Sequence, residues 1–332
     1  MYPAKMGAGR GNTSGRDVLV PTRAGLYCPA GDFHIDPTAG VDRAVITHAH
    51  ADHARPGSRR YLASRESLPL LRERLGKVEL EGLEYGRPIR LGKAWVSLHP
   101  AGHILGSAQV RVEVGGEVWV HAGDYKRDPD PTCAPFEVVP CDTFITESTF
   151  GLPIYRWPPA EQVAADMLRW WEANRAAGKV SVLLCYSLGK AQRVLAELGR
   201  LTAQPVHLHP QVEAMTAHYR AAGVRFGPTE PLAPDRQLPP GALAILPPAA
   251  ARAQLAGLEV ATGLVSGWMA VPKRRRGSVG FVVSDHADWP ALVATVRATG
   301  ARRVLVTHGD GTVLARYLRE QLGVDAELLA AG

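Results

Sequence analysis

The sequence is poor in cysteine and contains no long apolar segment. Its 332 residues include four cysteines, none of which form a Cys-x-x-Cys pair. This excludes a disulfide-rich secreted scaffold and favours a reducing compartment. No apolar run approaches the roughly 20 residues that a membrane-spanning helix needs, and residues 1–16 lack the apolar core of an export signal. We therefore expect a cytoplasmic protein that does not engage a membrane, with a flexible tail over residues 1–16.

Acidic residues are outnumbered by basic ones. The chain has 38 Lys and Arg against 32 Asp and Glu, a net charge of +6, and 46% of its residues are hydrophobic. The hydrophobic content is sufficient for a packed core and excludes a disordered chain. The positive charge suits a polyanionic partner without requiring one.

The most informative segment is rich in histidine. It is His48-Ala49-His50-Ala51-Asp52-His53, which directly follows a predicted buried strand, residues 43–47. Imidazole nitrogens and carboxylate oxygens are ligands that zinc and related divalent ions favour. The alternative is a solvated, histidine-rich loop without a metal.

Three further candidate ligands follow predicted strands, each beside a glycine. They occur in Gly102-His103, Gly123-Asp124 and His308-Gly309. Together with the first segment they form a set of seven candidate ligands: His48, His50, Asp52, His53, His103, Asp124 and His308. Seven ligands are too many for one four-coordinate ion and suit two ions that share a carboxylate. Such a pair activates water and neutralises the charge that builds up at a phosphodiester under attack. Asp36 and His121 are candidates for residues that support these ligands.

These motifs resemble a known family. His48-Ala49-His50-Ala51-Asp52-His53 matches the HxHxDH signature of the metallo-β-lactamase superfamily. The segments 147–151 (Glu-Ser-Thr-Phe-Gly), 284–288 (Ser-Asp-His-Ala-Asp) and 307–309 (Thr-His-Gly) are similar to the additional motifs of the β-CASP nucleases. Within that group the chain most resembles the bacterial DNA ligase-associated exonucleases, in its compact length and in residues 27–37 and 186–190.

The resemblance implies roles for individual residues. His48, His50 and His103 would hold one ion, Asp52, His53 and His308 the other, and Asp124 would bridge them. His286 would be the general acid, Glu147 would orient it, and Asp52 would count among the catalytic residues as well as the ligands. The donor set favours Zn²⁺ and admits Mn²⁺.

A second candidate site lies in a strand-to-helix turn, Tyr186-Ser187-Leu188-Gly189-Lys190. A hydroxyl, backbone N–H groups and a helix N-terminus together can bind an anion. In β-CASP relatives the equivalent loop contacts phosphate, which makes Ser187, Gly189, Lys190 and Ser284 candidates for a terminal-phosphate pocket. An ordinary turn is the alternative. The basic run of residues 273–276 could follow a nucleic-acid backbone, or could be a solvated loop.

The expected fold class is α/β. Alternating strands and helices from residue 151 onward indicate a parallel unit, with predicted helices at 161–177 and 289–299 and a strand at 280–284. By resemblance, residues 17–150 and 280–332 form a metallo-β-lactamase αβ/βα sandwich and residues 151–279 an inserted α/β β-CASP domain. The site is expected in the cleft between them.

The preferred function is a metal-dependent DNA exonuclease that acts on single strands or ends in DNA repair. The resemblance implies association with an ATP-dependent DNA ligase and a helicase. A ribonuclease similar to RNase J is the first alternative, and histidine at position 308 favours it. A small-molecule metallohydrolase and a non-catalytic scaffold are two further alternatives; the segment 151–279 with Glu147 and His286 argues against the former, and the complete ligand set against the latter.

Overall fold

A computed structural model describes residues 17–232, 238–254, 259–271 and 277–330. The predicted tail over residues 1–16 and the basic run 273–276 lie outside the described residues. No helix in the part of the chain that the structure describes is long and apolar enough to cross a membrane.

Two sheets pack face to face. Sheet A has the order β1-β2-β3-β4-β5-β6, and sheet B has the order β19-β18-β11-β10-β9-β8-β7. The strands of sheet A are β1 (Val20–Thr22), β2 (Gly25–Cys28), β3 (Phe33–Ile35), β4 (Arg43–Val45), β5 (Arg60–Ser64) and β6 (Glu79–Leu83). Those of sheet B are β7 (Ile89–Leu91), β8 (Ala94–Pro100), β9 (Ala108–Val114), β10 (Glu117–His121), β11 (Thr143–Glu147), β18 (Arg303–Thr307) and β19 (Asp325–Leu328).

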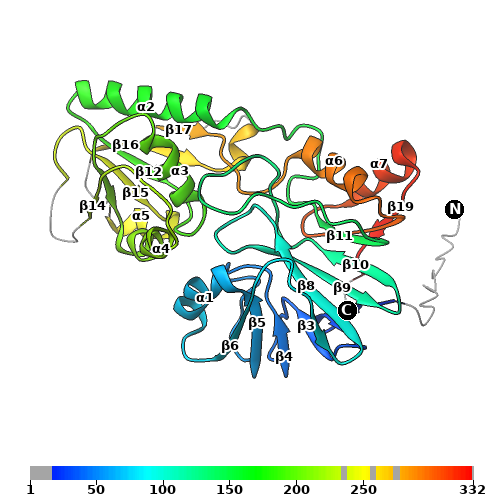
Figure 1. Ribbon diagram of the computed structural model, residues 1–332. Helices are drawn as coiled ribbons and strands as arrows, with labels where there is room; N and C mark the ends of the chain where they lie inside the picture. Colours follow the sequence, from blue (N-terminus) through cyan, green and yellow to red (C-terminus); the bar gives the residue numbers. More distant parts are fainter. Residues whose placement is uncertain (1–16, 233–237, 255–258, 272–276, 331–332) are drawn as a thin grey trace, which may run out of the picture.

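The core between these sheets is apolar, with Val45 and Leu62 of sheet A and Val96, Val110 and Ile145 of sheet B in one cluster. Helices cover both outer faces (Figure 1). The short η1 (Arg65–Ser67) leads into α1 (Leu68–Leu75), which packs on sheet A. On the far side, α6 (Trp289–Thr299) and α7 (Thr312–Leu322) pack on sheet B. The four layers therefore form an αβ/βα sandwich.

A third sheet and its helices lie to one side of this sandwich (Figure 1). Sheet C has the order β14-β13-β15-β12-β16-β17, and all of its pairings are parallel. Its strands are β12 (Val180–Leu184), β13 (Val206–Leu208), β14 (Thr229–Pro231), β15 (Leu243–Leu246), β16 (Val260–Val265) and β17 (Ser278–Phe281). Its helices are α2 (Ala160–Ala176), α3 (Lys190–Gly199), α4 (Pro210–Ala221), α5 (Pro248–Gln254) and η2 (Gly267–Ala270). Parallel strands need such crossovers, which explains the strand–helix alternation of this segment.

The predicted α/β class is confirmed. A difference arises near residue 280, where we expected a strand over 280–284. The observed strand is β17 (Ser278–Phe281), and it pairs with β16 of sheet C. The apolar pattern there is short, and pairing with β16 rather than local sequence sets its ends. Sheet C thus extends to Phe281.

Candidate metal centre

The candidate ligands gather where strands of both sheets end. His48, His50 and His53 lie in the loop after β4 of sheet A. His103, Asp124 and His308 follow β8, β10 and β18 of sheet B. These three strands share one direction, because β10 and β18 both run parallel to β11 while β9 runs antiparallel to β8 and β10. Their carboxyl ends therefore meet at one edge, next to the loop of sheet A.

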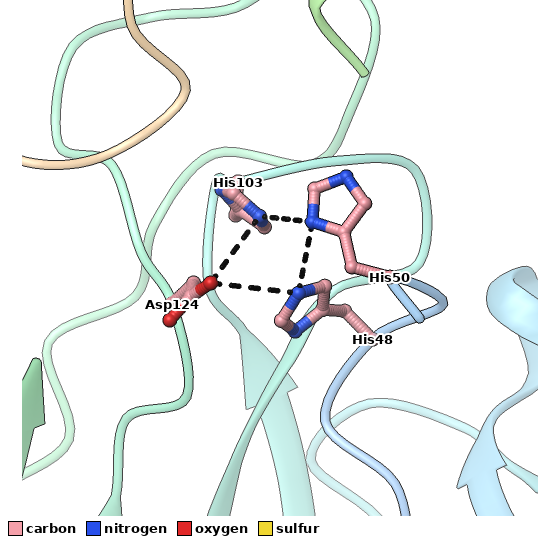
Figure 2. Close-up of side chains that lie close together, drawn as sticks. All are labelled: His48, His50, His103 and Asp124. Carbon is pink, nitrogen blue, oxygen red and sulfur yellow. Dashed lines mark hydrogen bonds and ion pairs between the residues drawn. The ribbon is translucent and has the colours of Figure 1, made fainter. Parts of the chain in front are cut away.

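Four of these side chains form a compact group. The donor atoms of His48, His50, His103 and Asp124 all lie within 4.8 Å of one another and could hold a metal ion (Figure 2). His50 Nδ1 is 3.1 Å from the Nε2 atoms of both His48 and His103. Asp124 Oδ2 is 3.6 Å from His48 Nε2 and 3.8 Å from His103 Nε2. Ligands about 2.1 Å from a tetrahedral zinc lie roughly 3.4 Å apart, so this donor set fits such an ion.

The imidazoles of His48, His50 and His103 are held in the form that binds metal. Burial lowers the pKa of His48 and His50, and lowers that of His103 to about 3. Neutral imidazole offers a lone pair to a metal ion, whereas imidazolium does not. Burial opposes the charged form of Asp124, but the neighbouring histidines outweigh it and hold the pKa of this carboxyl well below its usual range.

Asp124 belongs to a second group as well. His53, Asp124 and His308 also could hold a metal ion. Asp124 Oδ2 lies 3.4 Å from His53 Nε2, and its Oδ1 lies 3.6 Å from His308 Nδ1. Asp52, predicted as a ligand of this group, points mostly into solvent: its side chain is 72% exposed and its Oδ2 lies 3.8 Å from His53 Nε2. Its role as a ligand therefore stays a prediction.

Residues around the ligands set their orientation. Asp36 accepts hydrogen bonds from the backbone and hydroxyl of Thr47, at 2.8 and 2.5 Å, and from His53 Nδ1 at 2.7 Å. This leaves Nε2 of His53 facing Asp124. His103 Nδ1 donates to the carbonyl of Asp285 at 2.7 Å, which turns its Nε2 toward the group. Such partners fix the tautomer and ring orientation of metal-binding histidines. His121 instead accepts from Gly123 N–H at 3.2 Å and shapes the loop that holds Asp124.

His286 and Glu147 lie beside the shared carboxylate. His286 Nδ1 is 2.8 Å from Glu147 Oε2 and 4.0 Å from Asp124 Oδ2. Glu147 is the last residue of β11 and is buried. Burial alone would lower the pKa of His286, but the charges of Glu147 and Asp124 outweigh it and raise this pKa to about 9. A protonated imidazole is thus held at the rim of the centre.

The predicted phosphate-binding residues are engaged with the protein itself. Lys190 is buried, and its Nζ lies 2.8 Å from Asp285 Oδ1. The Gly189 N–H donates to Gln192 at 2.8 Å, and Gln192 also donates to the Ser187 carbonyl at 3.0 Å. Ser284 is buried, and its Oγ accepts from His286 N–H at 3.1 Å. Phosphate binding at these four positions stays a prediction.

Two contributors were missed from the sequence. Asp285 links Lys190 to the centre, and only its place inside the segment 284–288 could have drawn attention to it. Trp157 donates from Nε1 to the His286 carbonyl at 2.8 Å and from its backbone to Asp288 at 3.0 Å. No sequence signal marked Trp157, because its contact depends on chain segments about 130 positions apart.

No family model matches the sequence. Among curated proteins, the chain is 34% identical over 313 residues to a probable DNA ligase of Opitutus terrae, across 91% of this chain and 30% of that protein. It is 28% identical over 214 residues to the ribonuclease TTHA0252 of Thermus thermophilus, across 53% of this chain and 48% of that one. It is 29% identical over 143 residues to the endoribonuclease ysh1 of Aspergillus fumigatus, across 42% of this chain and 16% of that one. The chain thus spans less than half the length of each of these relatives.

Among solved structures, a protein of unknown function from Enterococcus faecalis has a similar fold. The TM-score is 0.58 at 13% sequence identity, with 81% of this chain and 76% of that chain covered. At this identity the likeness concerns the fold alone.

Proposed function

We propose that the chain is a two-metal phosphodiesterase that degrades nucleic acid, a nuclease of metallo-β-lactamase fold with a β-CASP insertion. One observation carries the proposal: Asp124 belongs both to the group of His48, His50 and His103 and to the group of His53 and His308, and it lies next to the His286–Glu147 pair. His48, His50 and His103 would hold one ion, and His53, His308 and Asp52 the other. Zn²⁺ fits this donor set, with Mn²⁺ as the alternative.

The residues beside the ions would supply the proton that the leaving group needs. A bound pair of divalent ions activates water at neutral pH and neutralises charge at phosphorus. His286, protonated and held by Glu147, would donate its proton to the departing oxygen. Water thereby replaces that oxygen on phosphorus, and the products are a phosphate monoester and an alcohol. Such general acid catalysis contributes typically about 10²–10⁴-fold to the rate.

DNA is the proposed substrate, attacked from an end as an exonuclease in DNA repair together with an ATP-dependent ligase and a helicase. The similarity that extends over 91% of this chain to a protein named as a probable DNA ligase supports this choice. RNA is the second candidate, because two other relatives are named as ribonucleases. Degradation of RNA would make the chain a ribonuclease similar to RNase J.

The division into domains is part of the proposal. Residues 17–150 and 280–332 would form the metallo-β-lactamase domain and residues 151–279 the β-CASP domain, after a tail of residues 1–16. The core of sheet C supports the division, since it contains residues from Val163 to Phe281 and none from sheets A or B. A further apolar cluster joins the two parts, with Leu188 and Tyr219 packed together with residues of sheet A and α1. The pairing of β17 with β16 of sheet C favours ending the β-CASP domain at Phe281, two residues later than this division places it.

A time course on end-labelled oligonucleotides tests the function. Single-stranded and duplex DNA and matched RNA are incubated with metal-free protein to which Zn²⁺, Mn²⁺ or Mg²⁺ is added back. We expect metal-dependent shortening of DNA. Cleavage of RNA with DNA untouched at equal concentration would favour the second candidate, and no cleavage of either would contradict the proposal.

Asp124→Ala provides the matched test of the centre. Removing the shared ligand should lower the rate by more than the roughly 10–100-fold that loss of a supporting residue costs. Asp166→Ala, which alters a partly exposed aspartate of α2, should leave the rate unchanged. Equal turnover in Asp124→Ala and wild type would place the chemistry elsewhere.

A further inference from the structure

Two exposed aromatic side chains, Tyr186 and Trp268, lie near the candidate centre. Among the described residues the large aromatic side chains that are exposed are Trp95, Tyr186 and Trp268, at 46%, 65% and 52%. Tyr186 and Trp268 both follow strands of sheet C, β12 and β16, which are neighbours and run parallel. The loop that holds His286 follows β17, the next strand of the sheet. The three loops therefore leave the same edge of sheet C.

Tyr186 is connected to His286 through two charged residues. The Nζ atom of Lys190 lies 5.0 Å from the centroid of the Tyr186 ring. The same ammonium group is 2.8 Å from Asp285 Oδ1, which lies 4.0 Å from His286 Nε2. The ammonium group contacts the ring while leaving most of its surface open.

Trp268 approaches the same histidine through buried rings. Its ring centroid is 4.8 Å from that of Phe150 and 5.7 Å from that of Tyr155, both of them buried. The Phe150 ring in turn lies 6.0 Å from the His286 ring. A Cβ at Gly267 would come within 2.6 Å of the Phe150 ring, so the absence of a side chain there permits this close packing. The indole thus packs on buried rings, and about half of the surface of Trp268 is exposed to solvent.

A supported, open aromatic ring is suited to stacking with a nucleobase. Every base has a π-face, and one base on one aromatic side chain changes affinity by about 5- to 150-fold. Bases inside a duplex already stack on their neighbours, so only unpaired bases can use such a ring. Sequence-specific and single-strand binding proteins use this contact widely.

We propose that Tyr186 and Trp268 are stacking platforms for unpaired bases next to the phosphodiester that is cut, and that the site consequently prefers single-stranded nucleic acid. The inference rests on the proposed function, whose centre it flanks. It adds a preference for single-stranded over duplex nucleic acid, and this preference comes from two side chains that are not metal ligands.

Binding in the presence of a chelator separates this inference from catalysis. Fluorescence anisotropy measures the Kd of the 332-residue chain in EDTA for a labelled single strand of about ten nucleotides and for an abasic strand of equal length and charge. Tyr186→Ala and Trp268→Ala should each weaken binding to the base-containing strand by about 5-fold or more. Both should bind the abasic strand as wild type does.

Conservative and control variants make the test specific. Tyr186→Phe and Trp268→Phe retain a ring and should retain most of the affinity. Tyr186→Leu and Trp268→Leu keep apolar volume without a ring and should weaken binding as the alanine variants do. They replace the alanine variants in the test if one of those fails to fold. Trp95→Ala alters an exposed tryptophan at the opposite end of β8 from His103 and should change nothing.

The outcomes distinguish the two proposals. Wild-type affinity in all the ring-less variants would overturn the platforms, and would indicate that the rings serve another contact such as a protein partner. Ring-dependent binding without any cleavage when metal is restored would support the platforms and contradict the nuclease. Metal-dependent cleavage at the same rate in wild type and in the ring-less variants, with unchanged binding, would support the nuclease and contradict the platforms.

Discussion

Asp36 joins three hydrogen bonds at one carboxylate, although it is not in either group of possible ligands. Its bond to His53 Nδ1 leaves Nε2 of that ring free to face Asp124, and its bonds to Thr47 hold the start of the ligand loop. A single side chain thereby determines both the loop conformation and the donor atom that it offers. Its φ of 43°, unusual for a residue other than glycine, suggests that the backbone there is held in place by these contacts.

Asp36→Asn tests this role. The amide cannot satisfy the Thr47 hydroxyl and the His53 ring as a carboxylate does, so the imidazole should lose its fixed orientation. We expect metal affinity to fall about 10–100-fold while the fold is retained, as measured by competition with a chelator. Asp42→Asn, at a surface aspartate paired with Arg59 and Arg60, is the control. Unchanged affinity in Asp36→Asn would exclude a positioning role.

The proposed transfer of a proton from His286 also depends on a single residue. His286→Ala should lower kcat about 10²–10⁴-fold on an oligonucleotide, whose leaving oxygen needs a proton. The loss should be much smaller on a p-nitrophenyl ester of a nucleotide, because that leaving group departs as a stable anion. Steady-state kinetics on both substrates measures the difference, with His218→Ala, a partly exposed histidine outside the centre, as control. Equal losses on both substrates would argue for a structural role.

At the scale of elements, strand ends determine where the functional side chains lie. His308 follows β18 directly and has a φ of 49°. Its carbonyl accepts from both the backbone and the hydroxyl of Ser148, at 2.9 and 2.5 Å. A Cβ at Gly309 would lie 2.6 Å from the Ser148 carbonyl oxygen, so only glycine fits there without displacement. Hydrogen bonds from Ser148 to the His308 carbonyl therefore join the turn after β11 to the turn after β18 and fix the position of His308.

The N-terminus of α6 is likewise joined by hydrogen bonds to a segment far away in the sequence. Asp288 accepts at Oδ1 from Ala291 N–H and at Oδ2 from Trp157 N–H, both at 3.0 Å. Asp288→Ala removes both acceptors and should lower the free energy of unfolding by about 1–2 kcal/mol, measured by denaturant titration. Asp288→Asn keeps an acceptor for the helix and should lose less. Wild-type stability of Asp288→Ala would show that the cap is unimportant.

Local signals predicted such helices well. The expected helix 289–299 coincides with α6, because Asp288 and Gly300 mark its ends within the sequence itself. The expected strand 280–284 is displaced to Ser278–Phe281, because strand ends follow the neighbouring strand. Of these two elements, the helix was therefore predicted more closely than the strand.

At the scale of the whole molecule, the possible metal ligands around Asp124 connect distant parts of the chain. They include residues from His48 to His308, and contacts from the side of sheet C reach them as well. The Leu188 carbonyl lies 3.3 Å from His50 Nε2, and the Asp285 carbonyl accepts from His103. An ion bound there would consequently tie both sheets of the sandwich together.

Metal binding should therefore stabilise the fold. With free metal at about 100 times its Kd, the free energy of unfolding should rise by about 2.7 kcal/mol, since the unfolded chain does not present the assembled site. Thermal unfolding of metal-free protein with and without added Zn²⁺ measures the rise in Tm. Asp124→Ala should lose the rise, and Asp166→Ala should keep it. An equal rise in both variants would mean that the metal binds elsewhere.

The amino-acid sequence alone determined the α/β class, the helices with caps of their own, and the choice of His48, His50, His103 and Asp124 as residues worth testing, because each depends on local spacing. Only the tertiary structure decided that Asp52 faces solvent, that Lys190 pairs with Asp285, and that His53 is the ligand that Asp36 supports. These outcomes depend on which segments meet in space and on how much water they exclude. Such contacts join residues far apart along the chain, and spacing along the sequence does not record them.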